Sequence, residues 1–303
     1  MYLGQIARSR KICQNAINMH TQIIPMRADN PAVFLETYLL NQSTEFQQAK
    51  KRPAVIVCPG GAYLFTSDRE AEPIALRFMA QGYHAFVLRY SVRERFPQPM
   101  LDIAKAIATV RTHAEEWHLD PDQIAVCGFS AGGHLAASIG VMWDKPMIYE
   151  PLGMRPEQIR PNALILGYPV IDFELEPTEP RAFEPGMEPM SLDELVPLFT
   201  FGERTPPAEL VDQYRANLHV SSNTPPTFIW HTADDELVAA RNALRFAMAL
   251  ADKKIPYELH IFDHGVHGLA LANEVTDVEG RFINPPSQIW MDLAVKWLKR
   301  NMS

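Results

Sequence analysis

The sequence predicts an α/β fold in which a mostly parallel central sheet carries helices on both faces. Short apolar runs rich in β-branched residues alternate with longer amphipathic segments, a pattern typical of parallel strands joined by helical crossovers. Strands are expected at 54–58, 83–90, 124–127, 163–167, 227–231 and 257–262, with an earlier edge-side strand at 33–40. Helices are expected at 72–81, 99–118, 135–141, 236–251 and 286–300.

Length and composition limit the class of protein. The chain has 303 residues, of which 47% are hydrophobic and 21% charged, as in a globular protein with a sizeable core. We expect a single domain, residues 1–303, because α/β chains often reach this size as one unit. The net charge of −8 argues against nucleic acid or an anionic membrane surface as a partner, since both bind clustered Lys and Arg.

The N-terminus and the cysteines predict a cytoplasmic protein. Residues 1–11 lack the apolar stretch and cleavage site of a signal peptide, and no run approaches transmembrane length. Cys13, Cys58 and Cys127 are an odd number without metal-ligand spacing, which fits a reducing compartment. We expect no metal and no cofactor, and the sequence is compatible with a homo-oligomer.

Residues 172–226 interrupt the alternation of strands and helices. They hold 9 of the 25 prolines, with 11 acidic and 3 basic residues. Proline at this density prevents long helices and strands, so we expect a cap-like insertion of short helices over the carboxyl ends of the strands. A disordered linker is the alternative, and the apolar residues between 192 and 201 argue against it.

The sequence Gly-Phe-Ser-Ala-Gly at 128–132 lies between a buried strand and a helix. This is the pattern of a nucleophile elbow, in which the hydroxyl of the serine, here Ser130, stands clear of the sheet at a strained corner. Unpaired N–H groups at the start of the following helix would stabilise a developing oxyanion there. A loop of small residues is the alternative reading. His134, in the first turn of the helix, is expected to be structural.

A second glycine pair, in Pro-Gly-Gly-Ala-Tyr at 59–63, follows the strand 54–58. Lipases and esterases carry His-Gly-Gly-Gly in the equivalent loop, where backbone N–H groups complete an oxyanion hole. Here proline replaces the histidine and Ala62 replaces the last glycine. The expected donors are the N–H groups of Gly61, Ala62 and Ala131, and a plain Gly-Gly turn is the alternative. Ser67 and Glu70 have the spacing of a capping box for the helix that begins near residue 72.

A serine nucleophile needs a histidine base and a carboxylate that orients it, and in this arrangement both follow the serine along the chain. After the strand 227–231, two aspartates compete, and we favour Asp235 over Asp234 because Val238 completes an Asp-x-x-Val pattern. After the last core strand, the pattern Gly-x-His-Gly favours His267 over His264 as the base. His264 is expected to be a loop residue or a partner of the catalytic residues that does not react itself.

These motifs resemble those of bacterial α/β-hydrolase esterases, the acetyl and xylan esterases. The resemblance spans roughly residues 50 to 275 and rests on the segments 52–63, 67–70, 128–134, 231–238 and 265–268, in matching order and strand context. It implies an α/β-hydrolase fold and a serine esterase with Ser130, Asp235 and His267 as catalytic triad. It also implies short acyl substrates, such as O-acetyl groups on sugars or xylo-oligosaccharides.

The expected substrate is a neutral small-molecule ester with a short acyl chain. Bulky Tyr63 and Phe129 are expected to contact substrate and crowd its acyl side, and the acidic insertion to disfavour anionic substrates near the mouth of the site. A peptidase-like enzyme or a lactone hydrolase with the same triad is an alternative. A binding protein of the same fold without activity is another, and the presence of nucleophile, acid and base argues against it.

Overall fold

The computed structural model describes residues 20–42, 51–180, 182 and 186–302. The expectations for residues 1–11 and for Cys13 lie outside these ranges. In the described ranges no helix has both the length and the apolar character needed to cross a bilayer.

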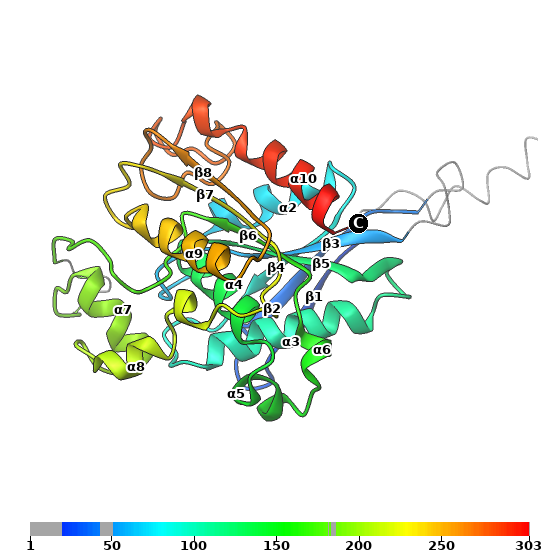
Figure 1. The fold of residues 1–303 in the computed structure, drawn as a ribbon, viewed down its shortest axis with the longest axis horizontal. Coiled ribbons are helices and arrows are strands. Elements are labelled where there is room, and N and C mark those ends of the chain that lie inside the picture. Colours follow the sequence, from blue (N-terminus) through cyan, green and yellow to red (C-terminus); the bar gives the residue numbers. More distant parts are fainter. Residues whose placement is uncertain (1–19, 43–50, 181, 183–185, 303) are drawn as a thin grey trace, which may run out of the picture.

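The core of the structure is one eight-stranded sheet, as expected for an α/β-hydrolase fold (Figure 1). The strand order is β1-β2-β4-β3-β5-β6-β7-β8. The pairs β1/β2 and β2/β4 are antiparallel, and all the other pairs are parallel. The strands are β1 (His20–Pro25), β2 (Phe34–Leu39), β3 (Arg52–Cys58), β4 (His84–Arg89), β5 (Leu119–Phe129), β6 (Ala163–Gly167), β7 (Thr227–Thr232) and β8 (Tyr257–Phe262).

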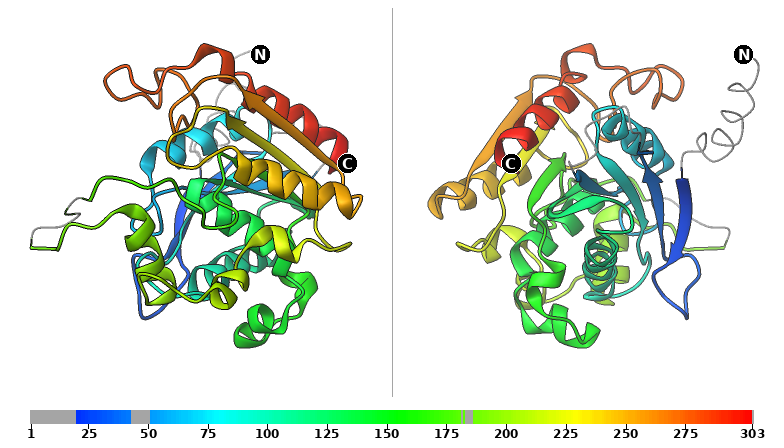
Figure 2. Two further views of the ribbon diagram at one scale, coloured as in Figure 1. Left: turned by 60° about the vertical axis from the view of Figure 1, so that its left-hand side comes forward. Right: turned by 90° about the vertical axis from the view of Figure 1, so that its right-hand side faces the viewer.

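Helices cover both faces of the sheet (Figure 2). They are α2 (Glu72–Met79), α3 (Gln98–Thr112), α4 (Ser130–Met142), α5 (Pro146–Tyr149), α6 (Pro156–Ile159), α7 (Leu192–Phe201), α8 (Ala208–Asp212), α9 (Arg241–Asp252) and α10 (Trp290–Asn301). Because strand side chains alternate, Ile56 of β3 belongs to a buried cluster that includes residues of α3, α4 and α9. Val55 and Val57 belong to a second cluster that includes residues of α2 and α10. The site-bearing strands β3, β5 and β7 are thereby buried on both faces.

Several expected boundaries differ from the structure. The strand expected at 33–40 is β2, which lies one place in from the edge, because β1 occupies the edge. The helix expected from 236 begins at Arg241, since the Asp235 carboxylate accepts the N–H groups of Leu237 and Val238 and holds this stretch as a turn. The helices expected at 99–118 and from 286 are shorter, as α3 and α10.

The capping box expected at Ser67 is absent. The Ser67 side chain makes no capping hydrogen bond. Glu70 turns inward instead, and its side chain is 4% exposed. It accepts hydrogen bonds from the Gly60 N–H and from the Tyr168 hydroxyl, so the carboxylate joins other loops rather than the helix start.

The segment 172–226 contains helices α7 and α8 and a 3-10 turn at Ala216–His219, with no additional strand among its described residues. A small apolar cluster joins Leu192 and Leu195 of α7 to Leu64, Ala62 and Leu237, which lie near strand ends of the sheet. The helix α7 therefore packs against the loops where the candidate site residues lie.

We expect the free energy of unfolding to fall as pH drops below about 6.5. Burial lowers the pKa of His84, His134 and His231 from 6.5 to about 4, so these rings stay neutral in the folded chain. In the unfolded chain they bind protons near pH 6.5, and the extra protons favour unfolding between pH 6.5 and 4. Urea titrations at pH 7.5 and 5.5 measure the effect; equal or higher stability at pH 5.5 would contradict it.

Candidate active site

Ser130 lies at a strained corner where β5 passes into α4. Its φ of 52° falls in the left-handed region that non-glycine residues rarely adopt. The corner is tight: a Cβ on Gly128 would lie 2.0 Å from the carbonyl oxygen of Gly132. A Cβ on Gly132 would lie 2.1 Å from the carbonyl oxygen of Cys58. Both flanking glycines are therefore required by close backbone contacts.

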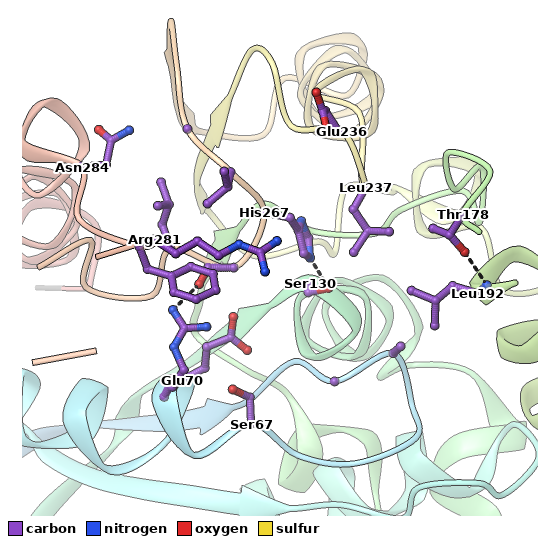
Figure 3. Close-up of a pocket in the computed structure, with 18 of the residues that line it drawn as sticks. Ser67, Glu70, Ser130, Thr178, Leu192, Glu236, Leu237, His267, Arg281 and Asn284 are labelled. Carbon is purple, nitrogen blue, oxygen red and sulfur yellow. Dashed lines mark hydrogen bonds between the residues drawn. The ribbon is translucent and has the colours of Figure 1, made fainter. Parts of the chain in front are cut away.

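A continuous hydrogen-bonded chain joins Ser130, His267 and Asp235. The Ser130 Oγ lies 2.8 Å from His267 Nε2 (Figure 3). On the other side of the ring, His267 Nδ1 lies 2.7 Å from Asp235 Oδ2. The second carboxylate oxygen of Asp235 accepts the N–H groups of Leu237 and Val238, both at 2.9 Å. Burial opposes ionisation of Asp235, but these hydrogen bonds hold its pKa below the usual value. An ionised Asp235 fixes the histidine tautomer that leaves Nε2 free to accept the serine proton.

Asp234 and His264 form a separate pair outside this chain. The Asp234 carboxylate accepts the Gly265 N–H at 2.7 Å, and its other oxygen lies 3.0 Å from His264 Nδ1. The hydrogen bond with His264 lowers the pKa of exposed Asp234, and the same contact raises the pKa of His264. Neither residue contacts Ser130 or Asp235 through a hydrogen bond in the described chain. The hydrogen-bonded chain of Ser130 thus includes Asp235 and His267, whereas Asp234 and His264 lie outside it.

The Gly-Gly loop, residues 59–63, faces the serine corner. Gly61, Ala62 and Tyr63 have φ values of 131°, 56° and 59°, and the Gly61 carbonyl oxygen accepts N–H groups further along the loop. Within the described chain, the N–H groups of Gly61 and Ala62 donate no hydrogen bond to protein. The Ala131 N–H belongs to the first turn of α4, where N–H groups lack an intrahelical acceptor. These three groups are available to an oxyanion.

Two cavities meet at Ser130. The larger holds about 900 Å³, and its polar rim includes Thr178, Glu236, Arg281 and Asn284 (Figure 3). The smaller holds about 30 Å³ and is almost entirely apolar. It is lined by Ala62, Tyr63, Ser130, Ala131, Val170, Phe173, Leu175, Leu192, Val196, Leu237 and Val238. The sequence alone did not indicate the walls at 170–196, because no motif marks how that segment crosses the site.

The two aromatic residues expected at the substrate lie in different places. Tyr63 lines the smaller cavity, and its hydroxyl lies 2.8 Å from His134 Nδ1. Phe129 lines neither cavity: it is buried against Tyr168 and Trp290 on the other side of the sheet. Side chains alternate along β5, so the residue before Ser130 points away from the site. The expected substrate contact of Phe129 is therefore not supported.

His134 has the structural role that the sequence suggested. Its Nε2 donates to the Tyr214 carbonyl oxygen at 2.7 Å, which leaves Nδ1 to accept the Tyr63 hydroxyl. The ring is fully buried between α4 and the segment that contains Tyr214. This contact links the segment 172–226 to the Gly-Gly loop.

The acidic excess of residues 172–226 does not gather at the mouth, contrary to expectation. In the described part of this segment, Glu179 is the one acidic residue that lines the larger cavity. Asp172, Glu174 and Glu176 form ion pairs with Arg241 or Arg245 of α9. Arginines outside the segment neutralise these charges, which the segment's own composition does not reveal.

No group of three or more His, Cys, Asp or Glu side chains is placed to hold a metal ion among the residues that the structure describes.

Curated relatives and solved structures match this chain. An endo-1,4-beta-xylanase B from Butyrivibrio fibrisolvens is 33% identical over 233 residues, 74% of this chain and 33% of the relative. An acetylxylan esterase from Xylanibacter ruminicola is 28% identical over 254 residues, 81% of this chain and 45% of the relative. The chain thus spans a third to a half of the length of these relatives.

Two solved structures match almost the whole chain. An acetyl ester-xyloside bifunctional hydrolase from Caldicellulosiruptor lactoaceticus is 34% identical, with a TM-score of 0.74, 92% of this chain covered and 96% of that one. A carboxylesterase from Lactobacillus plantarum is 31% identical, with a TM-score of 0.77, 94% of this chain covered and 98% of that one. The BD-FAE family model matches residues 42–250. The chain therefore belongs to the BD-FAE family and is a hydrolase of the α/β-hydrolase fold.

Proposed function

We propose that this hydrolase is a serine carboxylesterase that removes short acyl groups, above all acetyl, from sugar hydroxyls. The observation that carries the proposal is the chain of hydrogen bonds from Ser130 through His267 to Asp235, at a corner that exposes the serine hydroxyl to two cavities. The names of the relatives, which include acetylxylan esterase and acetyl ester-xyloside hydrolase, support the choice of substrate class.

In the acylation half of the proposed reaction, the Ser130 Oγ attacks the ester carbonyl carbon while His267 Nε2 takes the hydroxyl proton. The resulting oxyanion accepts hydrogen bonds from the N–H groups of Gly61, Ala62 and Ala131. Asp235 stabilises the imidazolium that forms. The tetrahedral intermediate collapses, the carbon–oxygen bond to the alcohol breaks, and His267 returns the proton to the departing alkoxide.

Deacylation repeats these roles with water as the nucleophile. His267 Nε2 takes a proton from a water molecule that enters through the larger cavity, and the hydroxide attacks the acyl-Ser130 carbonyl. The same backbone N–H groups hold the second oxyanion. Cleavage of the ester to Ser130 releases the carboxylic acid and restores the serine hydroxyl, so no cofactor is consumed.

The smaller cavity limits the acyl group. Its volume of about 30 Å³ compares with the roughly 10–15 Å³ that one water-sized probe occupies, so it accepts only a few heavy atoms. An acetyl methyl fits this apolar space, whereas an eight-carbon chain does not unless the walls move. The larger cavity would then hold the alcohol. Its mixture of Arg281, Asn284, Glu236 and Thr178 with exposed Phe65 suits a ligand rich in hydroxyl groups.

Replacement of Ser130 by Ala should lower hydrolysis of an acetyl ester by a factor on the order of 10³ or more, because no acyl-enzyme can form. His267→Ala should cost about as much, since the members of a triad act as a unit. His264→Ala is the matched control and should cost much less. Steady-state kinetics of the purified variants decide this, and a Ser130→Ala variant with most of its activity would refute the mechanism.

The two aspartates should differ in their effect on the reactivity of Ser130. Asp235→Asn leaves the histidine in the wrong tautomer, so labelling of Ser130 by a fluorophosphonate should slow by a factor on the order of 10³ or more. Asp234→Asn removes only the exposed contact with His264 and should slow labelling by less than about threefold. Intact-mass measurement over time gives both rates. The reverse order of severity would show that the acid is assigned to the wrong aspartate.

The value of kcat/KM should be greatest for acetyl esters and should fall through butyryl to octanoyl and palmitoyl, because the smaller cavity is short. Val196→Ala removes two methyl groups from its wall and should raise the butyryl-to-acetyl ratio several-fold. Leu198→Ala is the control, since Leu198 lies on the same helix and lines neither cavity. A maximum at eight carbons or longer in the parent protein would overturn the assignment of a short acyl group.

A further inference from the structure

A buried carboxylate lies beneath the candidate site and belongs to none of the proposed catalytic steps. Glu70 is 4% exposed, and no arginine, lysine or histidine pairs with it in the described chain. Its Oε2 accepts the Gly60 N–H at 2.7 Å, and its Oε1 accepts the Tyr168 hydroxyl at 2.6 Å. Figure 3 shows Glu70 and Ser130 along the same cavity. Burying a carboxylate costs free energy unless hydrogen bonds or an ion pair compensate for its lost hydration. The contacts with Gly60 and Tyr168 supply that compensation for Glu70.

The hydrogen bonds of Glu70 join two loops that must act together on Ser130. Through Gly60, Glu70 holds the loop whose next residues, Gly61 and Ala62, carry the free N–H groups. Through the Tyr168 hydroxyl, it reaches the Ala270 N–H, which donates to that oxygen at 2.9 Å. Ala270 lies three residues after His267 on the same loop. One carboxylate and one phenol therefore connect the oxyanion donors with the base.

The packing around this link leaves it little freedom. A Cβ on Gly60 would lie 2.6 Å from Glu70 Oε2 and 3.0 Å from the Ser130 Cβ, so carboxylate, loop and nucleophile corner are in contact. The Tyr168 ring is 1% exposed and lies edge-on to the His267 ring, with centroids 5.1 Å apart. Tyr168 also has a φ of 35°, a value that non-glycine residues rarely adopt, and its side chain contacts the histidine loop at His267 and Ala270.

We propose that Glu70 and Tyr168 are positioning residues, which hold the Gly-Gly loop and the histidine loop in register around the reacting carbonyl. The inference rests on the proposed esterase function. Both carboxylate oxygens of Glu70 are engaged by Gly60 and Tyr168, and Tyr168 lines neither cavity, so loss of these side chains should leave binding of the ground-state ester nearly intact. It would weaken stabilisation of the oxyanion, whose hydrogen bonds depend on placement within a few tenths of an ångström.

The test compares four variants. Glu70→Ala should lower kcat for an acetyl ester by about 100-fold or more with KM changed less than about threefold. Glu70→Gln should recover to within about tenfold of the parent, because the amide oxygen can still accept the Gly60 N–H while its NH₂ group donates to Tyr168. Tyr168→Phe keeps the ring and should lower kcat about tenfold. Glu72→Gln, at an exposed carboxylate two residues from Glu70, is the matched control and should match the parent.

Two further measurements separate positioning from general loss of structure. Affinity for an alkyl boronic acid, which forms a tetrahedral adduct on a serine hydroxyl, should fall in proportion to kcat. In the double variant Glu70→Gln/Tyr168→Phe the loss should be less than the product of the single losses, since both act through one link. If the Glu70→Ala variant folds and its kcat is unchanged, the inference is overturned. If Glu70→Ala does not fold, an unchanged kcat in Tyr168→Phe overturns it instead. A change in KM without a change in kcat would also overturn it.

Failure of the positioning role can be distinguished from failure of the proposed esterase function. An inactive Ser130→Ala variant together with a fully active Tyr168→Phe variant would refute only the positioning role. An active Ser130→Ala variant would refute the esterase mechanism itself, whatever the Glu70 series shows.

Discussion

The contact between two backbones, the serine corner and the Gly-Gly loop, is the constraint on which the rest of the site depends. β3 and β5 are parallel neighbours with Cys58 opposite Gly128, so their carboxyl ends deliver both turns to one edge of the sheet. The carbonyl oxygen of Cys58 then approaches Gly132 so closely that any side chain there would clash. The left-handed serine costs about 1–3 kcal/mol, and the complete burial of α4 and the end of β5 holds it in place.

The central part of the fold could be predicted from the sequence because its strands are buried on both faces. Such strands are continuous apolar runs, and five of the expected ones correspond to β3, β4, β5, β6 and β7. The serine corner could also be predicted from its glycines, since steric contacts exclude other residues at those positions. The choice between Asp234 and Asp235 also has a physical basis: only Asp235 is held by the N–H groups of Leu237 and Val238, with its other oxygen turned to His267.

Features that depend on contacts between distant segments could not be predicted from local patterns. β1 is an exposed edge strand in which Ile23 is 69% exposed, so it has no apolar run. Glu70 has the spacing of a capping residue, yet its partners Gly60 and Tyr168 come from two other loops. The acidic excess of 172–226 likewise meets its arginines on α9, which lies beyond that segment in the sequence. In each case the decisive partner is remote in sequence, and composition of one segment carries no information about it.

The walls of the two cavities come mostly from different segments, and this bears on how selectivity can be set. Residues 170–196 supply much of the smaller cavity, whereas residues 264–269 and 281–284 supply much of the larger one. Ala62, Ser130, Leu192 and Leu237 border both cavities. Most changes in one segment can therefore alter one cavity without moving the hydrogen-bonded chain of Ser130, whose members follow strands β5, β7 and β8 and do not belong to residues 172–226. In the proposed esterase, selectivity for the acyl group and selectivity for the alcohol are thus separable, with coupling expected at the residues that border both cavities.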